Sequence, residues 1–63
     1  MINVLELEPG TKIRLAGDAT AEVVSNPRDG VWVLVRYLTA PGNPAQVGTE
    51  ELVFADSIVD LLS

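Results

Sequence analysis

The sequence predicts a small all-β domain, either a five-stranded barrel or a strongly bent antiparallel meander. The chain has 63 residues, a length that allows a single domain over residues 1–63. Turn signals built from Pro, Gly, Asn and Asp recur at short intervals. The runs between these turns are short and rich in Val, Ile and Leu, which is typical of strands.

The strands are expected in chain order over residues 3–7, 11–15, 20–25, 31–38 and 51–55, with residues 58–62 forming a short final strand or a helical turn. The first segment alternates only weakly. In the second, Ile13 and Leu15 lie on one side while Lys12 and Arg14 lie on the other. The fourth, VWVLVRYL, is β-branched or aromatic almost throughout, which favours a strand.

A turn over residues 26–30 is expected to join the third and fourth strands as a tight antiparallel hairpin. Pro27 presets φ for the first corner, and Asn26 can cap the turn through its side chain. Gly30 can adopt a positive φ without strain. The later loop over residues 39–46 contains two prolines and one glycine, so we expect it to be exposed and comparatively mobile.

This layout resembles the Src-homology-3-like (SH3-like) small barrel, including its Tudor-like and nitrile hydratase β-subunit-like versions. The matching features are Pro9-Gly10-Thr11 leading into KIRL, the hairpin AEVVSNPRDGVWVLVRYL and the terminal ELVFADSIVDLL. The resemblance covers most of the chain and rests on strand spacing, not on diagnostic motifs. It implies that residues 55–57 form the single helical turn that often precedes the last strand. Because this superfold hosts many unrelated functions, the resemblance implies architecture alone.

A chain this short must bury nearly all of its large apolar side chains to be stable. The expected core takes one apolar side from each segment: Val4, Leu7, Ile13, Leu15, Val23, Val33, Val35, Leu52, Phe54, Ile58 and Leu61. An enclosed ligand pocket of ~300–1,000 Å³ would hollow out that core. We therefore expect neither a buried active site nor a small-molecule substrate.

The composition removes most catalytic chemistry. The chain has no Cys and no His, so it lacks thiol nucleophiles, zinc thiolates, imidazole ligands and an ordinary general base. Its carboxylates are interpreted as turn and surface residues: Asp18, Glu22 and Asp29, and the C-terminal Glu50, Glu51, Asp56 and Asp60. None fits a calcium-loop pattern. The sequence predicts a protein that is not an enzyme and has no catalytic residues, metal site or cofactor.

Net charge limits the partners. Nine acidic residues against four basic ones give a formal charge of −5, and scattered bases cannot make many phosphate contacts. Nucleic acid is therefore an unlikely direct partner. The longest apolar stretch, residues 31–35, is far shorter than the ~20 residues of a membrane span. With no basic, apolar leader at Met1, we expect a soluble cytoplasmic protein without a membrane partner.

The fourth strand carries the candidate site. If Val33 and Val35 share one face, Trp32, Leu34 and Arg36 share the other, which must be partly exposed because Arg36 would not be buried unpaired. One interpretation is a binding patch formed by Trp32, Leu34 and Arg36 with Arg28 nearby, since Trp and Arg are typical interface anchors. The other interpretation is that Trp32 covers an open barrel end with its Nε1 bonded to the backbone.

The sequence therefore favours a non-catalytic protein-interaction or accessory module that binds a protein partner or forms a homodimer. The alternative is a nucleic-acid-associated or regulatory barrel of Tudor-like or KOW-like geometry. That alternative predicts that Arg14, Arg28 and Arg36 cluster with Trp32 on one face. The competing interpretation of these basic residues is cross-strand pairing with acidic ones.

Overall fold

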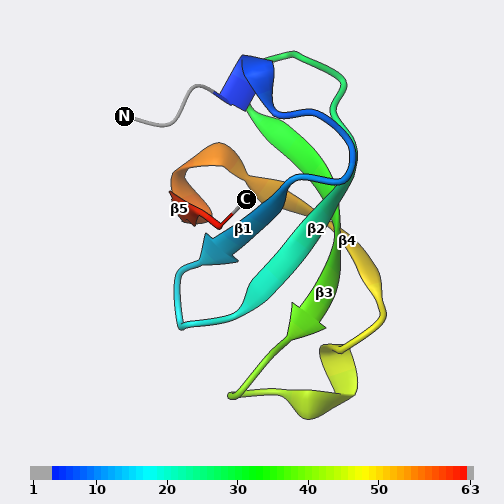
Figure 1. Ribbon diagram of the computed structural model, residues 1–63, viewed down its shortest axis with the longest axis vertical. Helices are drawn as coiled ribbons and strands as arrows, with labels where there is room; N and C mark the ends of the chain where they lie inside the picture. Colours follow the sequence, from blue (N-terminus) through cyan, green and yellow to red (C-terminus); the bar gives the residue numbers. More distant parts are fainter. Residues whose placement is uncertain (1–3, 63) are drawn as a thin grey trace.

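The computed structural model describes residues 4–62, and within them the chain forms one antiparallel sheet (Figure 1). Its strands are β1 (Lys12–Leu15), β2 (Thr20–Ser25), β3 (Trp32–Thr39), β4 (Glu50–Phe54) and β5 (Ile58–Leu61). The described residues also form three single-turn 3-10 helices: η1 (Val4–Glu6) precedes β1, η2 (Pro44–Gln46) lies between β3 and β4, and η3 (Ala55–Ser57) lies between β4 and β5. The structure confirms the all-β class with five strands, the helical turn before the last strand, and the strand alternative for the last segment.

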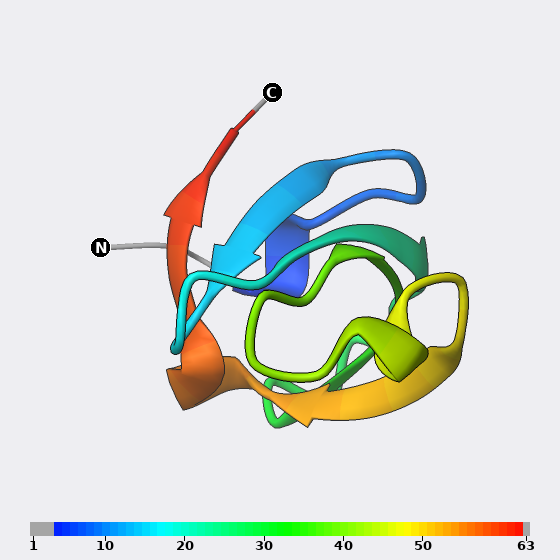
Figure 2. The same ribbon diagram turned by 90° about the horizontal axis from the view of Figure 1, so that it is seen from below.

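The strand order is β4-β3-β2-β1-β5. Strands β1 to β4 form a meander, and the short turn η3 returns the chain so that β5 pairs with β1. The register shifts within β1 and at two places in β2, and such bulges increase the local bend and twist of a strand. Figure 2 shows the result, a strongly bent sheet whose strands curl around a common interior.

The core lies inside this bend because each strand alternates between its two faces. On β3, for example, Val33 and Val35 are fully buried and Tyr37 nearly so. Seven predicted core residues are confirmed as buried: Leu7, Ile13, Leu15, Val23, Val33, Val35 and Ile58. Val4 lies outside the residues whose side chains the structure describes.

The core prediction is wrong for Leu52, Phe54 and Leu61, which are 53%, 47% and 47% exposed. On β4 the error is a shift of one residue: Val53 pairs with Val33 and faces inward, so its neighbours face outward. Leu61 lies on the edge strand β5, which has β1 as its neighbour on one side. A side chain at such an edge has fewer atoms packed over it.

The predicted strand over residues 3–7 is also wrong, because Val4–Glu6 form the 3-10 turn η1; Asn3 itself lies outside the described residues. Both sides of β1 are already paired, with β2 and with β5. The N-terminal segment therefore has no free side of β1 to join. It is held by other contacts, since Leu7 is buried and its carbonyl accepts a hydrogen bond from Asn26 Nδ2 at 2.9 Å.

The hairpin between β2 and β3 is confirmed as antiparallel. Asn26 Oδ1 accepts the backbone N–H of Arg28 at 2.9 Å, which is the expected side-chain cap of a turn. Gly30 has a φ of +81°, as predicted. Arg28 also adopts a left-handed φ of 62°, a conformation that costs a residue with a Cβ more than it costs glycine.

Candidate functional site

The candidate site lies on the outward face of β3 and β4. Alternation along β3 directs Trp32 and Leu34 outward, and the register places Phe54 opposite Trp32 and Leu52 opposite Leu34. We call these four residues the outer apolar patch. Their arrangement as two cross-strand pairs makes one continuous apolar surface on two adjacent strands.

Trp32 is fixed at one end of this patch. Its ring meets that of Phe54 edge-on, with centroids 4.6 Å apart and planes 60° apart, which is a favourable aromatic geometry. Both rings remain open to solvent, at 39% and 47% exposure. Of the two placements considered for Trp32, the structure therefore shows the outward, partly exposed one.

The backbone under Trp32 is held by Asp29. One carboxylate oxygen, Oδ1, accepts the N–H groups of Val31 at 2.8 Å and Trp32 at 3.0 Å. These hydrogen bonds, the one from Trp32 foremost, hold the pKa of Asp29 below its usual value because they favour the ionised carboxylate. Asp29 thus acts as a cap for the start of β3, in line with its interpretation as a turn residue.

Charged residues border the patch on the next row of the same face. Arg36 is directly opposite Glu50, and its guanidinium donates to the Glu50 carboxylate at 2.6 Å. On the other side Arg36 is opposite Glu22, which is in turn opposite Lys12. The outward face therefore changes from apolar to alternating charge within two residues of Leu34.

Arg28 is not part of this row. It lies in the loop between β2 and β3, and its guanidinium donates to the carbonyl of Leu5 at 3.4 Å. Arg14, on β1, is opposite Thr20 on one side and Asp60 on the other. The register thus places Arg14 on β1, two strands from Arg36, so Arg14 does not join the predicted cluster with Arg28, Arg36 and Trp32.

Sequence reasoning assigned Leu52 and Phe54 to the core and so missed half of the patch. Glu50 and Glu51 are consecutive, so each face of β4 begins with a charge, and alternation alone cannot choose between them. The pairing of Arg36 with Glu50 was the signal that could have decided. It places Glu50, and with it Leu52 and Phe54, on the same outward face as Trp32.

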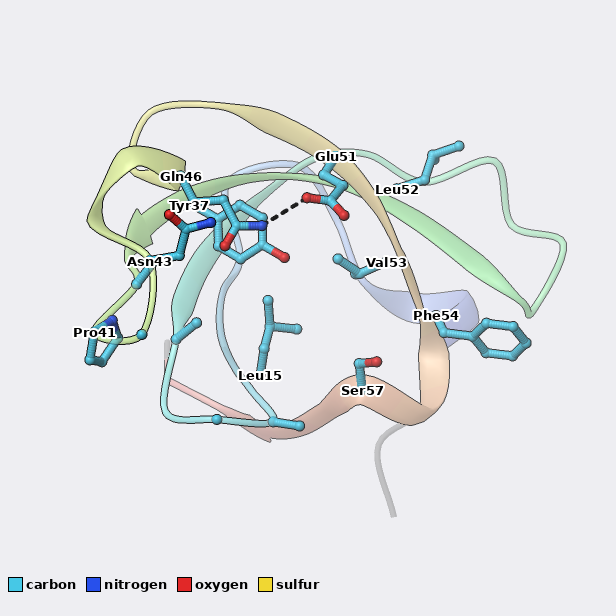
Figure 3. Close-up of a pocket in the computed structure, with 15 residues that line it drawn as sticks. Leu15, Tyr37, Pro41, Asn43, Gln46, Glu51, Leu52, Val53, Phe54 and Ser57 are labelled. Atoms are coloured by element: carbon cyan, nitrogen blue, oxygen red, sulfur yellow. Dashed lines mark hydrogen bonds between the residues drawn. The ribbon is translucent and has the colours of Figure 1, made fainter.

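A second feature lies on the inner side of β4, at one end of the sheet. It is an open pocket of about 360 Å³ bounded by β4, the β1–β2 turn, the loop over residues 40–46 and η3 (Figure 3). Figure 3 shows Leu15 and Val53 directed toward the pocket, while the side chains of Leu52 and Phe54 point away from it. The pocket lies between loops at the margin of the core, so it does not hollow out the core itself.

Polar groups gather on one wall of this pocket. Gln46 Nε2 donates to Glu51 Oε2 at 2.9 Å (Figure 3), and Tyr37 lies beside them. Burial raises the pKa of Tyr37, and the negative charge of Glu51 raises it further, while the Gln46 side chain opposes this by a smaller amount. The electrostatic potential at this wall is therefore negative, which disfavours a second negative charge there.

The remaining carboxylates are dispersed. Asp18 lies in the β1–β2 turn with a φ of 66°, and Asp60 Oδ1 accepts the N–H of Leu61 at 2.8 Å. Across residues 4–62, no three acidic side chains gather closely enough to hold a metal ion. In the same range, no helix is long and apolar enough to cross a membrane.

Comparisons with protein-family models, with curated proteins and with solved structures find no match to this chain.

Proposed function

We propose that this chain is a non-catalytic protein-interaction module that binds a protein partner, or a second copy of itself, through the outer apolar patch. The observation that carries the proposal is the pairing of Trp32 with Phe54 and of Leu34 with Leu52 on one outward face. A contiguous apolar surface with a polar border is the usual composition of a protein-binding site.

The exposure of large apolar side chains in so small a domain supports the proposal. A chain of this size buries only about 60% of the surface its unfolded form exposes, so its stability depends on every apolar side chain that it buries. Trp32, Leu52 and Phe54 nevertheless face solvent. A partner that covered these side chains would remove their apolar surface from water. This contributes roughly 25 cal/mol of binding free energy per Å², before the costs of association are subtracted.

The charged pair at the border of the patch can orient a bound partner. The Arg36–Glu50 pair is exposed on both sides, at 51% and 42%, so it is a rim feature that contributes little free energy itself. The aromatic pair lies at one end of the patch and the charged pair lies beyond the other end, and aromatic residues are enriched among those that carry the binding energy of protein interfaces. Trp32 and Phe54 are the residues we expect to dominate affinity.

The nucleic-acid-associated alternative has less support. Arg36 is paired with Glu50, and Lys12 and Arg14 lie opposite acidic residues in the register, so negative charge accompanies the basic residues where phosphates would have to bind. A partner with basic residues beside an apolar centre suits the charge of −5 better. The proposal keeps the cytoplasmic location expected from the sequence.

The test uses matched surface variants. Phe54→Ser and Leu52→Ser remove apolar area from the patch, while Val59→Ser removes it from β5, where Val59 is 56% exposed. Sedimentation equilibrium measures self-association, and amide chemical shifts of the labelled protein locate the surface that any purified partner contacts. We expect the two patch variants to weaken association about 30-fold, as loss of a central anchor does, and Val59→Ser to leave it nearly unchanged.

Two results would contradict the proposal. One is association that survives both patch variants and is lost with Val59→Ser, which would move the interface to β5. The other is a strictly monomeric protein whose purified partners leave the amides of Trp32, Leu34, Leu52 and Phe54 unshifted.

A further inference from the structure

The pocket on the inner side of β4 is separate from the outer apolar patch. Glu51 and Leu52 are consecutive residues on β4, and strand alternation directs their side chains to opposite sides. Figure 3 shows Glu51 on the pocket side and Leu52 pointing away. Leu52 and Phe54 border the pocket as well, but their side chains point to the outward face, so a ligand in the pocket and a protein on the outward face would contact different side chains of the same strand.

The walls of the pocket are held by the fold and not by a ligand. On the loop side, Asn43 N–H donates to the Ala40 carbonyl at 3.0 Å, and Gln46 N–H donates to the Asn43 carbonyl at 2.9 Å. The Thr49 hydroxyl then donates to the Gln46 carbonyl at 2.6 Å. These successive turns fix the segment that carries Gln46, so a ligand would not have to order it, which is a general advantage for binding.

The opposite wall is fixed in the same way. Ala16, which follows β1, donates its N–H to the carbonyl of Ser57 in η3 at 2.8 Å. This bond holds the β1–β2 turn against η3 and sets the far side of the pocket. The pocket is thus bounded by two hydrogen-bonded loop segments with β4 between them (Figure 3).

The floor of the pocket is apolar. Leu15, Ala40 and Val53 line it, and they are 3%, 7% and 7% exposed. Their packing is part of the core, so they offer a rigid surface on which methylene groups could rest. This floor fits an aliphatic stem and offers no hydrogen bonds to a polar one.

The wall above this floor carries the charge. Glu51 is the charged residue among those that line the pocket. Gln46 Nε2 occupies one acceptor position of its carboxylate, whereas a carboxylate has about four. The remaining positions favour a donor that carries a positive charge, because charge-assisted hydrogen bonds are about twice as strong as neutral ones.

We propose that this pocket binds an alkylammonium group, with its methylene stem on Leu15 and Val53 and its ammonium on the Glu51 carboxylate. An anion is disfavoured by Glu51. A purely apolar ligand would displace water from the Glu51 carboxylate and leave Gln46 as its hydrogen-bond partner, without a positive charge. The volume of about 360 Å³ is within the ~300–1,000 Å³ range of small-molecule sites. The same group occurs on free aliphatic amines and on lysine side chains, and the experiment distinguishes the two sources.

The first experiment needs no variant. The labelled full chain is titrated with n-butylammonium, n-butanol and n-butyrate, which share a stem and differ in charge, while its amide chemical shifts are recorded. We expect saturable shifts at Leu15, Glu51, Val53 and Ser57, with n-butylammonium binding about tenfold more tightly than n-butanol and n-butyrate not saturating. Equal binding of n-butanol and n-butylammonium, or no saturation with n-butylammonium, would overturn the proposal.

The second experiment isolates the charge. Glu51→Gln keeps the shape of the side chain and removes its charge, and we expect it to weaken n-butylammonium binding about tenfold. Glu50→Gln is the matched control, because it removes the same charge one residue away on the outward face, where Glu50 pairs with Arg36. An equal loss in both variants would show a general effect of surface charge and would contradict the assignment to Glu51.

The third experiment separates the two sources of the group. The probe is N-acetyl-lysine methylamide, compared with n-butylammonium on the same protein. Tighter binding of the capped lysine, with shifts along β4, would assign the pocket to a lysine of a protein or peptide. Tighter binding of n-butylammonium would assign it to a free amine, and failure of both probes to saturate would refute the site.

Discussion

Strands β3 and β4 are neighbours in one sheet, yet the residues on their inner faces differ. On β3 the β-branched residues Val33 and Val35 are fully buried, and Arg36 faces outward. On β4 an acidic residue, Glu51, faces the inner side, and Leu52 and Phe54 face solvent. β3 therefore keeps its inner face free of charge, although Trp32 and Leu34 share its outer face with Arg36, whereas β4 has an acidic residue on each face, Glu50 outward and Glu51 inward.

The difference follows from how far each strand is enclosed by its neighbours in the sheet. β3 lies between β2 and β4, so its inner side chains have neighbours on both sides. β4 is an edge strand that shares a single apolar contact row with the core, through Val53. Departures from the expected pattern are commonly found at functional sites, and β4 contributes to both surfaces discussed above.

The largest expected effect is the difference in unfolding free energy between a substitution of a buried residue on β3 and a substitution of an exposed residue on β4. Val35→Ala removes fully buried methyl groups and is expected to lower the free energy of unfolding by about 2 kcal/mol. Leu52→Ala deletes a larger side chain, but an exposed one, and is expected to change it by less than about 0.5 kcal/mol. Urea unfolding of both variants measures the difference, and a Leu52→Ala cost equal to that of Val35→Ala would remove the contrast.

The aromatic contact across the two strands should give the next largest effect. A double-mutant cycle with Trp32→Leu and Phe54→Leu is expected to yield a coupling free energy of ~0.5–1.5 kcal/mol, given the edge-on ring geometry. Unfolding of the four proteins measures it. Trp32→Leu combined with Val59→Leu serves as the control, and its effects should add, because β5 is not a neighbour of β3.

The ion pair at the border of the patch should contribute less. Both side chains are about half exposed, so a cycle with Arg36→Gln and Glu50→Gln is expected to give a coupling of ~0.2–1 kcal/mol in low salt. Raising the ionic strength should reduce it further. A coupling that is large and independent of salt would indicate that this pair is structural and not a border feature.

The smallest expected effect is on the ionisation of Tyr37. Its pKa is raised in the folded protein by burial and then by Glu51, so the folded state holds this proton more tightly than the unfolded chain does. The associated stability is present below the unfolded pKa of ~10 and is lost as the pH rises through the folded pKa. Glu51→Gln should lower the pKa of Tyr37, as followed by tyrosinate absorbance, and Glu50→Gln should lower it less.

Most of the fold was predictable because the relevant signals are local. Residues 20–25 have the predicted strand bounds. The Asn26 cap follows from the amide side chain of that residue, and the positive φ of Gly30 follows from its lack of a Cβ. Alternation on β3 was predictable because Arg36 identifies the outward face. In each case a single residue type determines the conformation or the face.

The errors occurred where pairing between distant segments decides the outcome. The segment over residues 3–7 has a weak strand pattern, but both sides of β1 are occupied by β2 and β5, which only the topology reveals. The orientation of β4 depends on which of two consecutive glutamates meets Arg36. The pocket depends on three loop segments that meet at one end of the sheet, and no local pattern encodes that meeting.

The outward position of Trp32 also determines what its fluorescence reports. The chain has one tryptophan, and it is 39% exposed in the folded protein, so part of the indole is still shielded from water. Unfolding hydrates that part and should shift the emission to longer wavelength, whereas a molecule that covers the patch should shift the emission to shorter wavelength. The direction of the shift in intrinsic emission therefore distinguishes loss of the folded state from occupancy of this surface.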